Sequence, residues 1–187
     1  MRSFGAISAR VYRLFHRNPE SNRIVVHLLG LKPDDRVLEI GCGPGAAIEQ
    51  AANRIGPDRV AAVEPSSTFV DMARKRVPGA DIRLGSATDI PFDDGTFSVI
   101  WSIASMHHWP ERDPGLVAQT TKLAPGGRLV IAERLLDKPG HGITPEETAD
   151  TIRYLEQLGH AHVRSYTQRD GKKAIQLIEG TLPARPR

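Results

Sequence analysis

Three glycines and a glutamate in the first third of the chain have the spacing of a site for a ribose-containing ligand. Gly41, Gly43 and Gly45 form a turn after an apolar run, and glycine, which has no Cβ, lets the backbone approach a ligand closely. Glu64 ends the next apolar run, 19 residues past Gly45, where an acid that binds ribose hydroxyls is expected. The spacing alone fits a nicotinamide dinucleotide as well as another nucleoside ligand.

The charges around this turn distinguish the two kinds of ligand. A dinucleotide places its pyrophosphate at a helix N-terminus, where free N–H groups are needed and a nearby anion is unfavourable. Pro44 removes one of these N–H groups, and Glu39 places a carboxylate just before the turn. That carboxylate would repel phosphate and attract the ammonium and sulfonium groups of S-adenosylmethionine. We therefore expect S-adenosylmethionine, and the alternatives are NAD and a tight turn without a ligand.

Two neighbouring histidines are the candidates for proton transfer. His107 and His108 follow an apolar run that ends at Ser102, and imidazole is well suited to accept a proton near neutral pH. One of them would act as a general base toward a hydroxyl or amine acceptor, and the alternative is that both only shape the loop. Ser102 is expected to line the donor site, and Trp109 to form a wall of the acceptor pocket.

The cysteine content bears on metal binding and on the cell compartment. Cys42 is the one cysteine, so the chain has no intramolecular disulfide. No paired cysteine spacing and no His/Cys spacing of zinc type occurs, so no metal site is expected. A reducing cytoplasm fits this content best.

The elements that must position these residues alternate in type, which is typical of a parallel sheet with crossover helices. Strands are expected at residues 36–40, 60–64, 81–84, 97–102, 128–133, 162–167 and 174–179, with a turn at 125–127 and a hairpin loop at 169–171. Helices are expected at 44–55 and 66–77, from 113, and from the capping sequence Thr144-Pro145-Glu146-Glu147 to Gly159. Two further helices precede the first strand. We expect one α/β domain over residues 1–187.

The series of motifs resembles class I S-adenosylmethionine-dependent methyltransferases. Residues 37–45, Val-Leu-Glu-Ile-Gly-Cys-Gly-Pro-Gly, are similar to the first motif of that family. Later segments follow in the family's order and are similar to the branch that methylates small molecules, including quinone-biosynthesis enzymes: 87–92, 93–100, 107–109 and 123–127. The resemblance implies a Rossmann-like fold, with a seven-stranded, mostly parallel sheet, a reversed last hairpin and helices on both faces.

The resemblance also implies which residues bind the donor. They are Glu39, Gly41, Cys42, Gly43, Glu64, Pro65, Ser86, Ala87 and Ser102. Ser86 stands where the family often has an aspartate, so adenine binding is expected to be weaker. The family's frequent insertion after the fifth strand is nearly absent, because only residues 135–143 separate that strand from its helix. The acceptor pocket must therefore be built from few residues.

The first 30 residues are expected to form a helical lid over a core of residues 31–182. Apolar residues recur there at helical spacing: Phe4, Ile7, Val11, Leu14 and Phe15. The arginines of this segment, with no acid before Glu20, are also typical of a membrane-surface or targeting helix. We favour the lid because no flexible linker separates the segment from the first strand.

The composition does not favour nucleic acid as a partner, so a small-molecule acceptor is expected. The net charge is +3, but the basic residues are scattered, and the densest run, Arg74-Lys75-Arg76, falls at a helix end where cations complement the dipole. Nucleic acid is therefore not expected as a partner. No stretch approaches the roughly 20 apolar residues of a membrane-spanning helix. The alternatives are an RNA or protein methyltransferase and a non-catalytic protein that binds S-adenosylmethionine or a partner.

Overall fold

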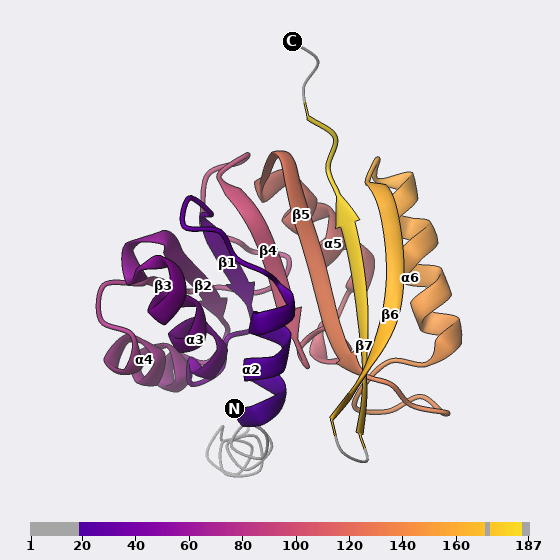
Figure 1. Ribbon diagram of the computed structural model, residues 1–187, viewed down its shortest axis with the longest axis horizontal. Helices are drawn as coiled ribbons and strands as arrows, with labels where there is room; N and C mark the ends of the chain where they lie inside the picture. The colour runs from indigo at the N-terminus through magenta and orange to yellow at the C-terminus, as the bar shows by residue number, and fades with distance from the viewer. Residues whose placement is uncertain (1–18, 171–172, 185–187) are drawn as a thin grey trace.

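A computed structural model describes residues 19–170 and 173–184 of the chain (Figure 1). The strands are β1 (Val37–Ile40), β2 (Val60–Glu64), β3 (Asp81–Leu84), β4 (Phe97–Ile103), β5 (Leu123–Arg134), β6 (Ala161–Asp170) and β7 (Lys173–Thr181). The helices are α2 (Pro19–Leu28), α3 (Ala46–Ile55), α4 (Ser67–Arg76), α5 (Arg112–Lys122) and α6 (Pro145–Gln157), with short 3-10 helices η1 (Pro57–Arg59) and η2 (Met106–His108).

The strands form one sheet in the order β3-β2-β1-β4-β5-β7-β6. Strands β1 to β5 run parallel to one another, whereas β7 runs antiparallel between β5 and β6. This sheet confirms the expected seven strands with a reversed last hairpin. The direction of the strand order switches between β1 and β4, and in such sheets ligands bind at the carboxyl ends of the strands beside this switch point.

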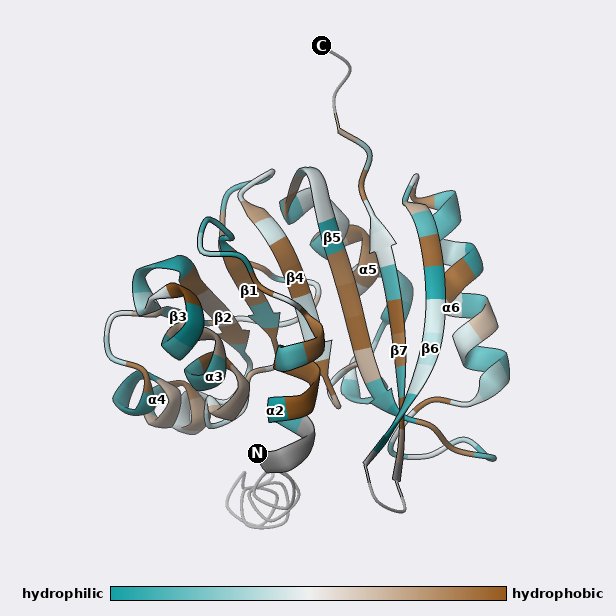
Figure 2. Cartoon of the chain, in the orientation of Figure 1, coloured by the Kyte–Doolittle hydropathy of each residue, from teal (hydrophilic) through white to brown (hydrophobic). Residues whose placement is uncertain are grey.

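The core lies on both faces of the sheet, because every residue of β1 and β2 is buried and both strands are nearly all apolar. One cluster of buried side chains joins the sheet to α2, α3 and α4, and a second joins the other face to α5 and α6. Figure 2 shows the apolar strands inside and polar residues on the outer sides of the helices. Helices therefore cover both faces, as expected.

Helix α2 is tied to the sheet at its C-terminal end. Val25, Val26 and Leu29 are buried against the core. The Arg128 guanidinium of β5 donates to the Leu29 carbonyl and also contacts the Glu179 carboxylate of β7, at 3.3 Å. This helix is the second of the two expected before the sheet. The first, over residues 4–15, lies outside the described residues.

Several expected boundaries were wrong. The Pro125-Gly126-Gly127 turn is a bulge inside β5, since one residue of β4 faces four of β5 between the pairs Phe97–Leu123 and Val99–Arg128. Helix α3 starts at Ala46, because Gly45 adopts a left-handed conformation, so Pro44 precedes the helix. Helix α5 starts at Arg112, ahead of the expected residue 113.

The hairpin strands β6 and β7 are longer than expected. Strand β6 includes Arg169 and Asp170, which were expected in the loop, and the third residue of that loop lies outside the described residues. The capping box at the start of α6 is confirmed, because the Thr144 hydroxyl accepts from the Glu147 N–H and the Glu147 carboxylate accepts from the Thr144 N–H. Among the helices of the described ranges, none has the length and apolar content needed to cross a membrane.

Candidate active site

The glycine-rich turn lies at the carboxyl end of β1, beside the switch point of the sheet. Gly41, Gly43 and Gly45 have φ angles of 75°, 53° and 87°, which side chains with a Cβ rarely adopt. The N–H groups of Gly41 and Cys42 donate to the Val63 carbonyl at 2.8 and 3.3 Å. The turn is thereby attached to the end of β2, which brings the backbone of the turn next to Glu64.

Glu64 links the glycine turn to the segment after β2. Its Oε2 accepts from the Gly43 N–H at 2.9 Å and its Oε1 from the Ser66 N–H at 3.0 Å. Burial raises the pKa of Glu64, and these two hydrogen bonds act in the opposite direction. Each carboxylate oxygen has two lone pairs and uses one here. The second lone pairs match the two hydroxyls of a ribose, so the geometry fits the nucleoside part of S-adenosylmethionine.

Glu39 is a buried acid at the same edge. Its side chain is 2% exposed, and Oε2 has no hydrogen-bond partner among the described residues. Burial, with a smaller contribution from the Glu64 charge, raises the pKa of Glu39 to about 8, against the opposing effect of hydrogen bonding to Trp101 and to the Ile48 backbone. At neutral pH Glu39 is therefore mostly protonated, and a nearby cation would favour its ionised form. The unpartnered oxygen fits a cationic ligand, and repulsion of phosphate would require that ionised form.

Ser105 closes over the glycine turn, a contact that the sequence did not predict. A Cβ placed on Gly41 would stand 2.1 Å from the Ser105 Oγ, so no larger residue fits there without a shift. The Trp109 indole N–H donates to the same Oγ at 3.1 Å. A Cβ on Gly115 of α5 would lie 3.1 Å from the Trp109 ring, which shows that the half-buried indole packs on that helix. In the sequence, this hydrogen bond is indicated only by the spacing of Ser105 and Trp109, which are four residues apart.

His107 is held by a buried carboxylate. Its Nδ1 lies 2.8 Å from the Oε2 of Glu133, the side chains being 9% and 1% exposed. Glu133 comes from β5, and the loop that carries His107 leaves β4 through Ala104, whose φ is 49° and whose N–H donates to the Ala132 carbonyl. With Glu133 ionised, Nδ1 carries the proton and Nε2 keeps its lone pair. That arrangement is the one a general base requires.

His108 and His141 lie beside His107. Ring centroids of His107 and His108 are 3.9 Å apart, and the His141 ring lies 5.6 Å from each of them. Burial, followed by repulsion from the two other histidines, lowers the pKa of His108. His141 belongs to the segment between β5 and α6, and the sequence did not indicate that it joins the pair.

The residues assigned to adenine lie in the loop between β3 and β4. The Ser86 Oγ accepts from the Asp89 N–H at 3.1 Å and lies 3.2 Å from the Thr88 hydroxyl, so it caps a local turn. Ala87 is buried near Gly115 of α5. Pro65 is exposed directly after β2. The contacts of Ser86 and Ala87 with adenine, and of Pro65 with the donor, remain predictions.

Cys42 and Ser102 are both buried. Burial raises the pKa of the Cys42 thiol well above its ordinary value, so the thiol stays protonated. Ser102 is fully buried, and its hydroxyl has no partner among the described residues. Because side chains alternate along a strand, Ser102 lies on the sheet face of Ile100, opposite to Trp101 and Glu39. Ser105, rather than Ser102, lies against the glycine turn.

Comparison with known families agrees with this geometry. The family model described as a methyltransferase domain matches residues 38–131, which include the glycine turn, Glu64 and the histidine pair. The chain belongs to this methyltransferase family. Its seven-stranded sheet has the fold of S-adenosylmethionine-dependent methyltransferases.

Three similar proteins place this methyltransferase among its relatives. It is 34% identical over 134 residues to 27-O-demethylrifamycin SV methyltransferase of Amycolatopsis mediterranei, covering 67% of the chain and 47% of that protein. It is 26% identical over 149 residues to the fatty-acid O-methyltransferase of Mycolicibacterium smegmatis, covering 79% and 53%. The crystal structure of a SAM-dependent methyltransferase from Aquifex aeolicus superposes with a TM-score of 0.69 at 22% identity, covering 91% and 92%. The chain thus spans about half the length of the two named sequence relatives.

Proposed function

We propose that the chain transfers the methyl group of S-adenosylmethionine to a small, mostly apolar acceptor. The observation that carries this proposal is that two groups lie at one edge of the sheet. Glu64 lies beside the glycine turn where β1 and β2 end, and the His107–Glu133 pair lies where β4 and β5 end. The donor supplies a methyl group already activated by a positive sulfur. The protein must therefore align donor and acceptor and exclude water, and it needs no nucleophile of its own.

The individual residues have separate tasks in this proposal. Glu64 accepts hydrogen bonds from the ribose hydroxyls, and Glu39 offers its unpartnered oxygen to the cationic part of the donor. His107 accepts the proton of the acceptor at Nε2, because Glu133 holds its Nδ1. The charge of the resulting imidazolium is stabilised by the buried Glu133 carboxylate. His108, which is more exposed, is the second candidate base.

Two observations support a small apolar acceptor. The named relatives methylate a rifamycin and a fatty acid, according to their names. The N-terminal end of α2 lies at the edge of the sheet where the parallel strands end (Figure 1). We therefore propose that residues 1–30 cover the donor, and that the apolar face of residues 4–15 lines the acceptor pocket. A covered apolar pocket would also desolvate the nucleophile.

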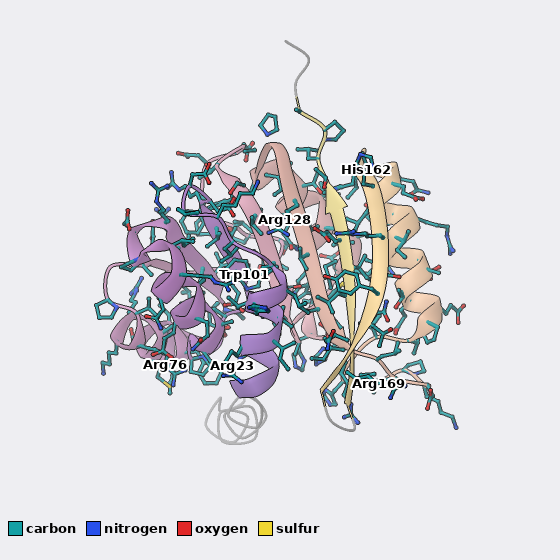
Figure 3. All side chains as sticks on the ribbon, viewed as in Figure 1. Arg23, Arg76, Trp101, Arg128, His162 and Arg169 are labelled. Atoms are coloured by element: carbon teal, nitrogen blue, oxygen red, sulfur yellow. The ribbon has the colours of Figure 1, made fainter. Side chains whose placement is uncertain are left out.

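The charge distribution supports this acceptor over nucleic acid. The arginines labelled in Figure 3 do not gather in one place: Arg128 lies over the upper part of the sheet, Arg169 near the end of the β6–β7 hairpin, and Arg23 and Arg76 at the lower left. In the densest basic run, the Arg74 guanidinium donates to the Ile82 carbonyl at 3.0 and 2.7 Å, so it serves the packing of α4 on β3. Nucleic-acid binding instead needs a continuous basic surface. We also assign the chain to the cytoplasm, because its one cysteine is free and buried.

A labelled-methyl assay tests the proposed reaction. The purified chain is incubated with S-adenosylmethionine carrying a radioactive methyl group and with a panel of fatty acids, phenols and hydroxylated polyketides. We expect label in an organic-soluble product. Label that enters only RNA or protein would overturn the acceptor class. With a working acceptor, His107→Gln should lower kcat at least 100-fold, as expected for a lost general base, while His108→Gln has a smaller effect.

A further inference from the structure

Three histidines from two different loops meet at the carboxyl edge of the sheet. His107 and His108 belong to η2, and His141 to the segment between β5 and α6. One ring nitrogen from each lies within 4.8 Å of those of the other two. The described residues contain no other group of three or more histidine, cysteine or acidic side chains arranged in this way.

The surroundings of this three-histidine cluster resemble those of a built metal site. The Nδ1 of His107 is hydrogen-bonded to Glu133, so Nε2 is the ring nitrogen that is available to bind a ligand. Glu133 is 1% exposed, and its second oxygen, Oε1, has no partner among the described residues. A carboxylate that holds the far nitrogen of a metal-binding imidazole fixes the ring orientation and increases ligand basicity. A merely solvated group of histidines would not require this buried acid.

We propose that His107, His108 and His141 bind one divalent transition-metal ion, with Glu133 as the outer carboxylate. Three imidazoles suit zinc, copper or nickel, and they do not suit magnesium or calcium, which prefer oxygen ligands. Three nitrogens on one tetrahedral zinc ion stand about 3.4 Å apart, given bonds of about 2.0–2.1 Å. The exposed rings of His108 and His141 can rotate to close the remaining distance. This proposal departs from the sequence-based expectation of no metal site.

The proposed ion leaves a position free for another ligand. Three protein nitrogens leave a fourth tetrahedral position open, as in zinc sites that bind a water or a substrate. The cluster lies at the sheet edge where the donor is proposed to bind. The ion would use the Nε2 lone pair of His107, so the metal-bound chain could not use His107 as the base. The metal proposal is therefore an alternative to the base role of His107, and it leaves the proposed donor site at Glu64 and the glycine turn unchanged.

Direct binding measurements test the site without an activity assay. The full chain, free of any histidine tag, is titrated with ZnCl₂ by calorimetry and with CoCl₂ by visible absorption. We expect one ion per chain with a micromolar or lower Kd, and cobalt bands typical of tetrahedral nitrogen coordination. His141→Ala should weaken binding at least 100-fold, and Glu133→Gln about 10–100-fold, as for other outer carboxylates. His27→Ala, at an exposed histidine of α2, is the matched control and should bind like the wild type.

Two results would overturn the site, and both are independent of methyl transfer. The first is the absence of one-to-one binding by the folded wild-type chain, as judged by circular dichroism. The second is unchanged binding by His141→Ala, which would place the ion elsewhere. Titration of the same samples with S-adenosylmethionine keeps the proposals distinct. Loss of zinc binding with retained donor binding removes only the metal site, whereas zinc binding without donor binding counts against the proposed function.

Discussion

At the scale of single residues, Glu64 is central to the proposed donor site. It already accepts one hydrogen bond on each oxygen from the backbone, and a ribose would add two more. Because a hydrogen bond to a charged group is worth roughly 1.5–3 kcal/mol, Glu64→Ala should weaken S-adenosylmethionine binding at least tenfold. Calorimetric titration measures this. Glu156→Ala, at an exposed acid on α6, is the control and should not change the Kd. Unchanged affinity of a folded Glu64→Ala protein would remove Glu64 from the site.

The buried acid Glu39 makes stability depend on pH. Its pKa is raised from 4.5 to about 8 by burial, so between these values the folded chain keeps a proton that the unfolded chain has lost. The free energy of unfolding should therefore fall, as the pH rises through this window, by about 1.4 kcal/mol per pH unit. The contribution is fully present below the unfolded pKa and lost above the folded one.

Glu39→Gln tests this dependence, because glutamine has no proton to lose. The unfolding free energies of wild type and variant, measured in urea at several pH values, should diverge in favour of the variant between pH 5 and 8. Glu156→Gln supplies the control for a surface acid. Parallel curves for wild type and Glu39→Gln would mean that Glu39 is not protonated by folding.

The sequence predicted some site residues and missed others for a physical reason. Glu64 and the glycine turn were predicted because local rules connect their spacing to one ligand. Ser105, Glu133 and His141 were missed, since their roles arise only when separate loops meet in the folded chain. His141 is 33 residues from His108 in the sequence, yet the two rings lie 5.6 Å apart.

At the scale of elements, the short parallel strands were the most predictable. Strands β2 and β3 have the expected bounds. Strand β2 is a buried, nearly all-apolar run between turn residues, whereas β3 is a short edge strand in which only Ile82 is buried. The bulge in β5 was missed, since Pro125-Gly126-Gly127 reads as a turn when its neighbours are unknown. The pairing of β5 with β7 ends at Arg128, and two hydrogen bonds beyond it hold the segment in place: the Gly126 N–H donates to the Leu182 carbonyl, and the Leu182 N–H donates to the Gly127 carbonyl.

The glycine turn contacts the loop of residues 105–109, here called the histidine loop, and this contact gives a prediction about stability. Gly41→Ala places a Cβ on the Ser105 Oγ and in a left-handed conformation, whereas Gly95→Ala meets only the conformational cost, since nothing lies within 4 Å. That cost is about 1–2 kcal/mol. Urea unfolding should therefore show a larger loss for Gly41→Ala, accompanied by weaker donor binding. Adding Ser105→Gly should restore part of the stability. Equal losses for the two glycine variants would show that the histidine loop does not lie against the turn.

At the scale of the whole molecule, the strand order was predictable only through the resemblance. Alternating periods indicate a parallel sheet, but they do not determine which strands are neighbours, because pairing is a long-range property. The motifs supplied that order, and the observed sheet agrees with it. The segment between β5 and α6 is short, and we therefore propose that the N-terminal segment, residues 1–18, contributes to the acceptor side.

The last prediction concerns that N-terminal segment. On the proposal that residues 1–30 form a lid, deletion of Met1 to Arg17 should abolish methyl transfer and leave S-adenosylmethionine binding within about threefold, because lids complete the acceptor side and exclude water. Calorimetry and the labelled-methyl assay measure the two effects on one preparation, with circular dichroism as the test of folding. A full-length Leu14→Glu/Phe15→Glu variant should reproduce the loss of transfer if the apolar face of the segment is what the acceptor needs. Arg13→Gln, outside that face, is its control. Full turnover by the truncated chain, or robust methylation of bulk RNA by the intact one, would contradict the covered apolar pocket.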